Sequence, residues 1–339
     1  MLGARGYRRL FLRLLAAGLA LAPGARAEPD PCARTAPVSP CFDSDPLWIP
    51  TAPTPFTTVP SAHVLAPHTL GLLVAADYSN RPVVFVAPSP HPSGQEIDVV
   101  RATSTLTLGA RYGLFPGLDV GVALPFVPFQ TGAGTQSVTD QHGEPLATVA
   151  LRDPRLELGS TLLGRERNAP FALGTRLTLA LPLGTEHALA GTPSLTVAPA
   201  LTAEFELGRL ALGADLGWRI ARAVNVGTVR EGSSVRPALA AAVTLSEHPG
   251  LVLGAEAWLT AHVSGRPPGV PESTLDLPAE WLASVRLAPR AAWSFAAAGG
   301  SGIPLSKVRA ADGSETHALG VTSPDVRVLL AARCTLDSL

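Results

Sequence analysis

The stretch Leu118-Asp-Val-Gly-Val-Ala-Leu-Pro-Phe126 decides the fold class of this chain. Every second position, from Leu118 to Phe126, carries a large apolar side chain, while Asp119 and small residues or proline occupy the positions between. Successive side chains of a β-strand point to opposite faces. The stretch therefore predicts a strand with one apolar face and one small or polar face.

The same alternation recurs along the chain from residue 68 onward. Residues 209–219, for example, place Leu210, Leu212 and Leu216 on one face and Asp215 on the other. Gly, Pro or charged residues bound the segments, as is typical of turns between strands. We expect twelve strands, at approximately 68–79, 98–114, 117–130, 154–164, 169–182, 194–206, 209–221, 233–246, 250–263, 275–288, 290–301 and 323–335.

The predicted connections alternate in length. Short ones fall at 115–117, 165–168, 207–208, 247–249 and 289, and long ones at 80–97, 131–153, 183–193, 222–232, 264–274 and 302–322. Outer-membrane barrels combine tight periplasmic turns with long external loops in this way, and closure leaves no unpaired strand edge in lipid. We predict an all-β fold, a transmembrane antiparallel up-and-down β-barrel of about 12 strands, within residues 68–339. A secreted periplasmic β-sandwich is the alternative.

The composition agrees with this pattern and excludes other classes. The 339 residues are 46% hydrophobic and 16% charged, with a mean hydropathy of +0.26. Beyond the N-terminus no run of about 18 apolar residues occurs, so a helical membrane protein is not expected. The formal net charge of −1 and the lack of a basic block argue against a nucleic-acid partner. Aromatic residues are expected near the bilayer interfaces: Tyr112, Phe115, Phe171, Phe205 and Trp293 at the short-turn end, and Tyr78, Phe126, Phe129 and Trp218 at the long-loop end.

Residues 1–27 have the features of a cleaved signal peptide. Arg8, Arg9 and Arg13 precede an apolar stretch, and Ala25-Arg26-Ala27 has the small-x-small form of a cleavage site. The arginine pair also resembles a twin-arginine signal, but a general secretory signal is the simpler interpretation because barrels are exported unfolded. We predict that the protein resides in the outer membrane of a Gram-negative bacterium, with outer-membrane lipid and the barrel assembly machinery as partners.

Residues 28–67 form a Pro-rich segment, in which proline removes backbone donors and prevents a regular helix or central strand. A periplasmic tether is the simpler interpretation, and a plug folded into the barrel is the alternative. In an oxidising compartment Cys32 and Cys41 are expected to form a small disulfide loop. Cys334 is expected to be a small apolar side chain on a strand.

The face opposite the apolar one carries nearly all charged residues of the predicted strands. Charge facing lipid at the midplane costs about 2–4 kcal/mol, so these side chains are expected to line the lumen. Both signs occur at every depth, which fits either a network of ion pairs that stiffens a narrow lumen or a polar passage for small solutes. The predicted lumen-lining residues are Asp77, Arg101, Arg111, Asp119, Arg155, Glu157, Arg176, Glu204, Asp215, Arg219, Arg236, Glu256, Glu280, Arg286, Asp325, Arg327 and Arg333.

Motifs of catalysis are not found. An outer-membrane phospholipase needs Ser and His on the lipid-facing surface, but the alternation places Ser284 and His262 on the inner face. The chain has no Gly-rich phosphate loop, no HExxH and no His cluster with ligand spacing. We therefore expect no enzyme activity, no metal and no cofactor.

Four stretches carry a family resemblance: Leu70-Gly-Leu-Leu-Val-Ala-Ala-Asp-Tyr78, and residues 111–125, 153–159 and 324–330. They resemble the barrel region of myxobacterial OmpA-like outer-membrane proteins, and they are similar to the transporter-like barrels of phenol-degradation pathways. The resemblance covers roughly residues 68–335 and implies a barrel rather than a particular substrate.

The sequence thus predicts an outer-membrane barrel that is a passive channel or transporter for small solutes, or a structural barrel. One alternative is a non-conducting barrel that binds a partner or mediates adhesion through the external loops 80–97, 131–153 and 302–322.

Overall fold

The computed structural model describes residues 39–87, 95–135, 145–164, 169–226, 229–265, 277–290, 292–303, 305, 308–309, 315–316, 320–321 and 323–336. The predicted signal peptide, residues 1–27, lies outside this described part. Within it, no helix is long and apolar enough to cross a membrane.

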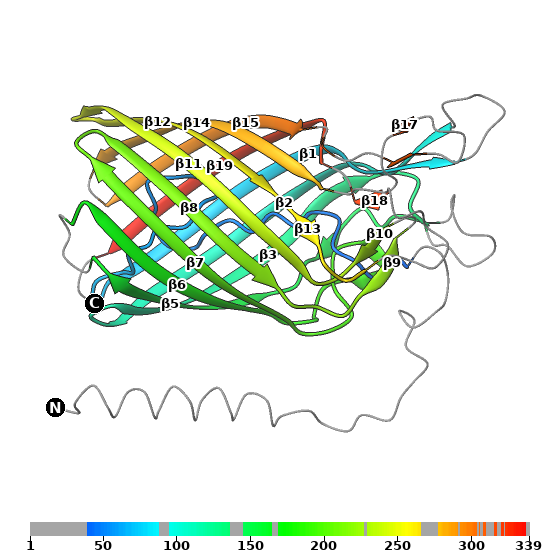
Figure 1. Cartoon of the computed structure of the whole chain (residues 1–339), viewed down its shortest axis with the longest axis horizontal. Helices are drawn as coiled ribbons and strands as arrows, with labels where there is room; N and C mark the ends of the chain where they lie inside the picture. Colours follow the sequence, from blue (N-terminus) through cyan, green and yellow to red (C-terminus); the bar gives the residue numbers. More distant parts are fainter. Residues whose placement is uncertain are drawn as a thin grey trace, which may run out of the picture. The chain divides into compact units, whose positions relative to one another are not determined.

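Twelve antiparallel strands close into a barrel (Figure 1). Each of the twelve barrel strands pairs with the barrel strands that precede and follow it along the chain. The first, β1, pairs with the last, β19, and this closes the barrel. The periplasmic β-sandwich is therefore wrong, because this sheet returns on itself. The barrel strands are β1 (Leu70–Ala87), β2 (Gln95–Phe115), β3 (Leu118–Thr131), β5 (Arg155–Leu163), β6 (Phe171–Ala180), β7 (Thr196–Leu207), β8 (Leu210–Arg219), β11 (Ser234–Glu247), β12 (Gly250–Leu259), β14 (Ala279–Arg290), β15 (Trp293–Ile303) and β19 (Val326–Leu336).

The alternation separates the two faces of the barrel wall as expected. In β3, Leu124 is 49% exposed and Phe126 is also exposed, whereas Asp119 and Ala123 are fully buried. The outer surface is an apolar belt in which Leu, Val and aromatic side chains from all twelve strands are exposed. Because the twelve strands alternate in direction, the start of β1 and the end of β19 lie together at the short-turn end of the barrel (Figure 1).

Tight turns join alternate strand pairs at this end. Gly117, between β2 and β3, has a φ of 84°, and Gly208, between β7 and β8, has a φ of 59°. These left-handed conformations favour glycine because it lacks a Cβ. Eight of the nine aromatic residues assigned to the strand ends are exposed; Tyr112 is half-buried and contacts His68.

The opposite end differs from the prediction, because residues 80–97 do not form a simple loop. Strand β1 continues to Ala87 and pairs with the start of β2, from Val84 opposite Asp98 to Ala87 opposite Gln95. Val83 and Phe85 on this extension pack in a buried cluster with Val99, Val100, Phe42, Leu189, Val224 and Val226. A second apolar core therefore lies at the loop end, where β-branched residues favour strand structure beyond the belt.

Short elements complete the loop end. They are β4 (Ala150–Leu151), the 3-10 turn Glu186–Ala188, the hairpin β9 (Val224–Val226) and β10 (Val229–Glu231), β13 (Ala261–His262), β16 (Val308–Arg309), β17 (Glu315–Thr316) and β18 (Gly320–Val321). Parts of the loops 80–97, 131–153 and 302–322 lie outside the described residues.

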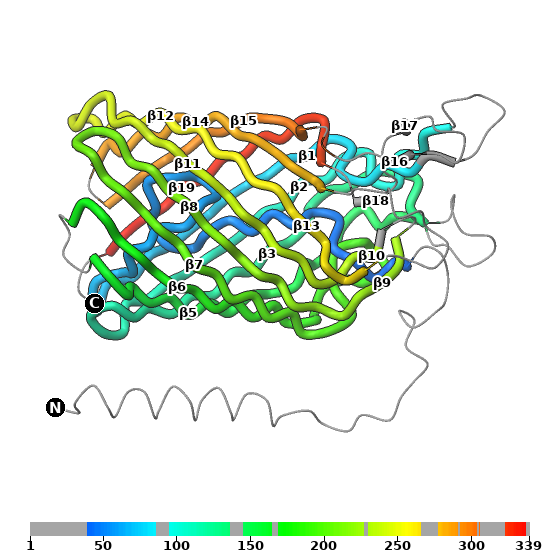
Figure 2. Tube along the Cα trace, viewed as in Figure 1, coloured from blue at the N-terminus to red at the C-terminus, as the bar shows by residue number. Residues whose placement is uncertain are grey.

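Residues 39–67, called the internal segment below, lie inside the barrel (Figure 2). The backbone follows the lumen from the loop end, where Asp43 bridges to Ala190, to the short-turn end, where His68 donates its backbone N–H to Gly113. Phe42, Phe56 and Val59 of this segment are almost completely buried. The internal segment therefore forms part of the barrel core.

Candidate functional site: the lumen and its internal segment

The most buried charged cluster centres on Arg327 of β19, which is 1% exposed. Its guanidinium donates to Glu280 of β14 and Asp77 of β1, both at 2.7 Å, and to Asp45 of the internal segment at 3.0 Å. All three carboxylates are buried as well. The Arg327 guanidinium thus joins two carboxylates of the wall to one carboxylate of the internal segment.

A second cluster lies on the neighbouring strands β2, β3 and β5. Arg111 of β2 forms a bidentate pair with Asp119 of β3, with both bonds at 2.7 Å, and contacts Glu157 of β5 at 2.6 Å. The hydroxyl of Thr51 donates to Glu157 at 2.8 Å, and the backbone N–H of Leu65 donates to Asp119 at 3.0 Å. Two separate points of the internal segment are therefore held by the same ion-pair network.

Glu256 of β12 binds a turn of the internal segment through backbone donors. The N–H groups of Thr58 and Val59 donate to one carboxylate oxygen at 2.7 and 2.9 Å, and that of Thr57 donates to the other at 2.5 Å. The hydroxyl of Thr58 adds a bond of 2.7 Å. Hydrogen bonds to an ionised acceptor are about twice as strong as neutral ones, so Glu256 is a principal anchor.

Further anchors follow towards the short-turn end. Glu204 of β7 accepts from the Ser61 hydroxyl at 2.8 Å and from the Ala62 N–H at 3.0 Å. Thr161 of β5 donates to the Ala62 carbonyl and accepts from the Val64 N–H, both at 3.0 Å. These hydrogen bonds satisfy backbone groups of the proline-rich internal segment, which have no partners in a helix or sheet.

Inward-facing glycines give the internal segment its space. A Cβ on Gly174 of β6 would stand 2.6 Å from the carbonyl oxygen of Ala62, and one on Gly213 of β8 would collide with the Phe56 ring. Gly217 of β8 is different, because its nearest neighbours would be 3.8 Å away. Gly174 and Gly213 thus occur where the internal segment passes close to the barrel wall.

Replacing Gly174 with Ala is expected to displace the internal segment, because the colliding atom belongs to the backbone and cannot rotate away. Overpacking of this kind costs about 1–3 kcal/mol. The free energy of unfolding, measured by urea titration in lipid vesicles, should fall by this amount. Gly217→Ala is the matched control, and equal stability of the two variants would refute this close fit.

The loop end holds one buried ion pair and one partly exposed network of charges. Arg152 forms an ion pair with Asp43, and burial raises the pKa of the Asp43 carboxyl to about 6 although this guanidinium opposes the rise. Arg81 bridges Glu96, Asp98 and Asp325 at the base of the extended β1–β2 hairpin. Exposed pairs of this type contribute at most about 1 kcal/mol.

Trp48 of the internal segment lies among cationic side chains of the wall. The guanidinium carbon of Arg219 is 4.1 Å and that of Arg155 is 5.2 Å from its ring centroid. Arg219 also donates to the carbonyl of Pro46 at 2.9 Å. Cation–π contacts and a backbone bond therefore position the indole between strands β5 and β8.

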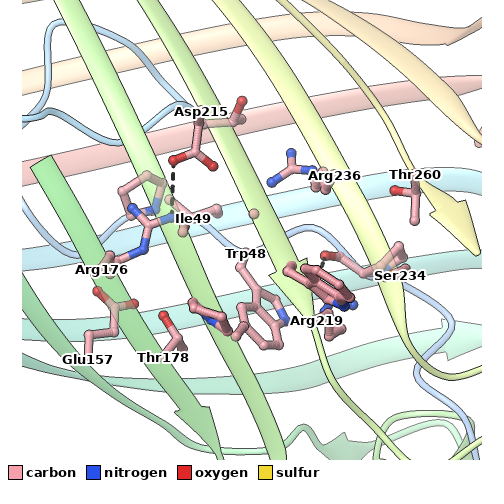
Figure 3. Close-up of a pocket in the computed structure, with 18 residues that line it drawn as sticks. Trp48, Ile49, Glu157, Arg176, Thr178, Asp215, Arg219, Ser234, Arg236 and Thr260 are labelled. Atoms are coloured by element: carbon pink, nitrogen blue, oxygen red, sulfur yellow. Dashed lines mark hydrogen bonds and ion pairs between the residues drawn. The ribbon is translucent and has the colours of Figure 1, made fainter. Parts of the chain in front are cut away.

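Cavities remain beside the internal segment along the described part of the lumen. One of about 60 Å³ lies in the loop-end half and includes Trp48, Arg219 and Arg236 in its lining (Figure 3). One of about 680 Å³ lies at the short-turn end and includes Arg286 and Arg333. Between them is a cavity of only about 20 Å³, which shares Pro50 and Arg176 with the first and Ser61, His63 and Val64 with the second.

The predicted lumen-lining residues fall into three groups. The buried ones are Asp77, Arg111, Asp119, Arg155, Glu157, Glu204, Asp215, Glu256, Glu280, Arg327 and Arg333. Arg176, Arg219, Arg236 and Arg286 are half-buried. The side chains of Arg101 and Asp325 are instead 68% and 54% exposed and belong to the loop-end network around Asp98 and Arg81.

Sequence reasoning missed the partners that the internal segment supplies, including Asp45, Trp48 and Thr51. A usable signal was present in the glycines on the inner face of the strands, such as Gly174 and Gly213, because they leave space for another part of the chain.

The described cysteines and the Ser and His residues considered in the sequence analysis lie outside the two buried ion-pair clusters. Cys41 is buried and disulfide-bonded, whereas Cys32 lies outside the described residues, so their pairing stays a prediction. Cys334 is a buried free thiol. His262 lies 3.1 Å from Glu231, and Ser284 is half-buried on the inner face of β14. Within the described residues, no group of three or more His, Cys, Asp and Glu side chains has the arrangement of a metal site.

A closed twelve-stranded barrel with an apolar outer belt and a charged interior is the fold of the outer-membrane β-barrels. No family model and no curated protein matches this chain. Among solved structures, an outer-membrane channel from Pseudomonas putida F1 is similar, with 13% identity and a TM-score of 0.56 over 81% of this chain and 98% of that chain. The NanC porin has 6% identity and a TM-score of 0.46 over 78% of this chain and 100% of that one. The fold of the first of these supports the barrel topology derived above.

Proposed function

We propose that this protein is an outer-membrane channel for small solutes, in which the internal segment controls passage. The observation that carries the proposal is the series of cavities of about 60, 20 and 680 Å³ through the lumen. Water needs about 10–15 Å³ of such space, so the middle cavity accommodates about one water molecule. Passage of a solute therefore requires the internal segment to move.

Charge in the lumen supports a polar passage. Carboxylates and guanidinium groups line the wall from one end to the other, and a hydrocarbon-like core would have stabilised a purely structural barrel at lower desolvation cost. The short-turn end then faces the periplasm and the loop end faces the outside. The sequence resemblance to transporter-like barrels of phenol-degradation pathways agrees with a transport role without specifying the solute.

Planar-bilayer recording tests the proposal with two proteins: the full chain and a variant that lacks residues 39–67. We expect small or brief conductance steps for the full chain and larger, sustained steps for the variant, because the lumen loses its filling. Heat-modifiable migration on a denaturing gel establishes that each barrel is folded. Folded proteins without any conductance step would overturn the channel and favour a structural or partner-binding barrel.

A further inference from the structure

The cavity of about 60 Å³ in the loop-end half of the lumen has an unbalanced set of charges. Its lining contains three guanidinium groups, from Arg176 of β6, Arg219 of β8 and Arg236 of β11, and two carboxylates, from Glu157 and Asp215. Figure 3 shows these side chains around Trp48, which enters from the internal segment. The cavity is therefore enclosed by strands on one side and by the internal segment on the other.

Both carboxylates already have other partners. Glu157 pairs with Arg111 at 2.6 Å and accepts from Thr51. Asp215 lies 3.6 Å from Arg176 and accepts from Thr202 at 2.6 Å. The two carboxylates thus neutralise Arg111 and Arg176 rather than Arg219 and Arg236.

Arg219 and Arg236 have no carboxylate within 4 Å in the described part of the chain. Arg236 stands over the Trp258 ring at 5.0 Å, and its buried Nη2 has no hydrogen-bond partner among the described residues. Arg155 lies on the Trp48 ring and is 4% exposed, with Nε and Nη2 similarly without described partners. Cations buried without a counter-charge are costly, so this region favours an anion.

We propose that this cavity is a binding subsite for the carboxylate of a small organic anion. Arg219 and Arg236 supply the charge, and the hydroxyl groups of Thr178 and Thr260 in the lining supply neutral hydrogen bonds. At 10–15 Å³ per water, the volume holds about four to six water molecules, which suits an anion of acetate size. A role of the subsite in selecting solutes rests on the proposed channel function, whereas binding itself does not require conduction.

Calorimetric titration of the full-length, detergent-solubilised protein tests the subsite. Sodium acetate is the probe, and acetamide, which has the same shape and no charge, is the control at constant ionic strength. We expect saturable binding of acetate and none of acetamide. Arg236→Gln should weaken acetate binding about 10- to 100-fold, since a hydrogen bond to a charged group contributes about 1.5–3 kcal/mol.

Ser234 offers a matched pair of variants, because it lies directly opposite Arg219 in the register of β8 and β11. Ser234→Asp supplies a tethered carboxylate and should abolish acetate binding, whereas Ser234→Asn should retain it. Heat-modifiable migration identifies variants that fold. Acetamide binding equal to that of acetate, or unchanged binding in folded Ser234→Asp, would overturn the subsite.

The outcomes separate the two proposals. If the barrel conducts but binds no acetate, the proposed subsite is refuted and the proposed channel function is supported. If the barrel does not conduct, but acetate binding is lost in Ser234→Asp and kept in Ser234→Asn, the subsite is supported and the channel function is refuted.

Discussion

Replacing Arg327 with Met is expected to lower the free energy of unfolding by about 3–5 kcal/mol, because it leaves buried carboxylates without their cation. Asp45, Asp77 and Glu280 all lie within 3.0 Å of this guanidinium, and all are almost completely buried. Methionine preserves much of the side-chain volume, so the loss reports on charge rather than on a cavity. Urea unfolding in lipid vesicles, followed by tryptophan fluorescence, measures the change.

Two further variants make this experiment decisive. Arg101→Met removes an arginine whose side chain is 68% exposed and should change stability by no more than about 1 kcal/mol. Adding Asp77→Asn and Glu280→Gln to Arg327→Met should restore part of the stability, because fewer unpaired charges stay buried. Equal stability of the Arg327→Met and Arg101→Met proteins would contradict the proposed role of the cluster.

Replacing Glu204 and Glu256 together with Gln is expected to release the internal segment. Each carboxylate accepts hydrogen bonds from backbone N–H groups of this segment, and a neutral amide forms bonds about half as strong. A loss of about 1.5 kcal/mol at each position would raise the population of the displaced segment about 100-fold. Conductance steps should become more frequent and larger than those of the unaltered protein.

Chymotrypsin provides an independent measurement of this release. Phe42 and Phe56 of the internal segment are almost fully buried and should be cleaved faster once the segment leaves the lumen. Glu206→Gln is the control, since Glu206 lies two residues from Glu204 on β7 but is exposed. The prediction fails if the double variant is cleaved no faster than this control.

The strand pattern was predicted from sequence almost in full. Asp119 and Leu124 in β3 illustrate the reason: one side chain meets the lumen and the other meets the outer surface, and residues five positions apart on a strand must face opposite ways. The error was at residues 80–97, where the extended β1–β2 hairpin packs against the cluster around Phe42. Its apolar partners come from distant parts of the chain, so no local pattern indicates the extension.

The alternation assigned the charged residues of the strands to the inner face, but it did not identify their partners. Arg111 and Asp119 are only eight residues apart and lie diagonally across the paired strands β2 and β3, so their pairing follows from the hairpin. Arg327 and Asp45 are 282 residues apart, and Glu256 binds backbone groups whose identity no side-chain pattern reveals. Which carboxylates pair with arginines and which bind backbone became visible only in three dimensions.

The sequence by itself determined the number of barrel strands, their order along the chain and the division into an outer and an inner face. These properties are local, because side chains alternate with a period of two wherever a strand separates an apolar from a polar environment. The tertiary structure alone decided the position of residues 39–67, which have no periodicity and whose prolines fit either a tether or a plug. Their place in the lumen depends on hydrogen bonds to Asp119, Glu204 and Glu256, three carboxylates that only barrel closure brings around one segment.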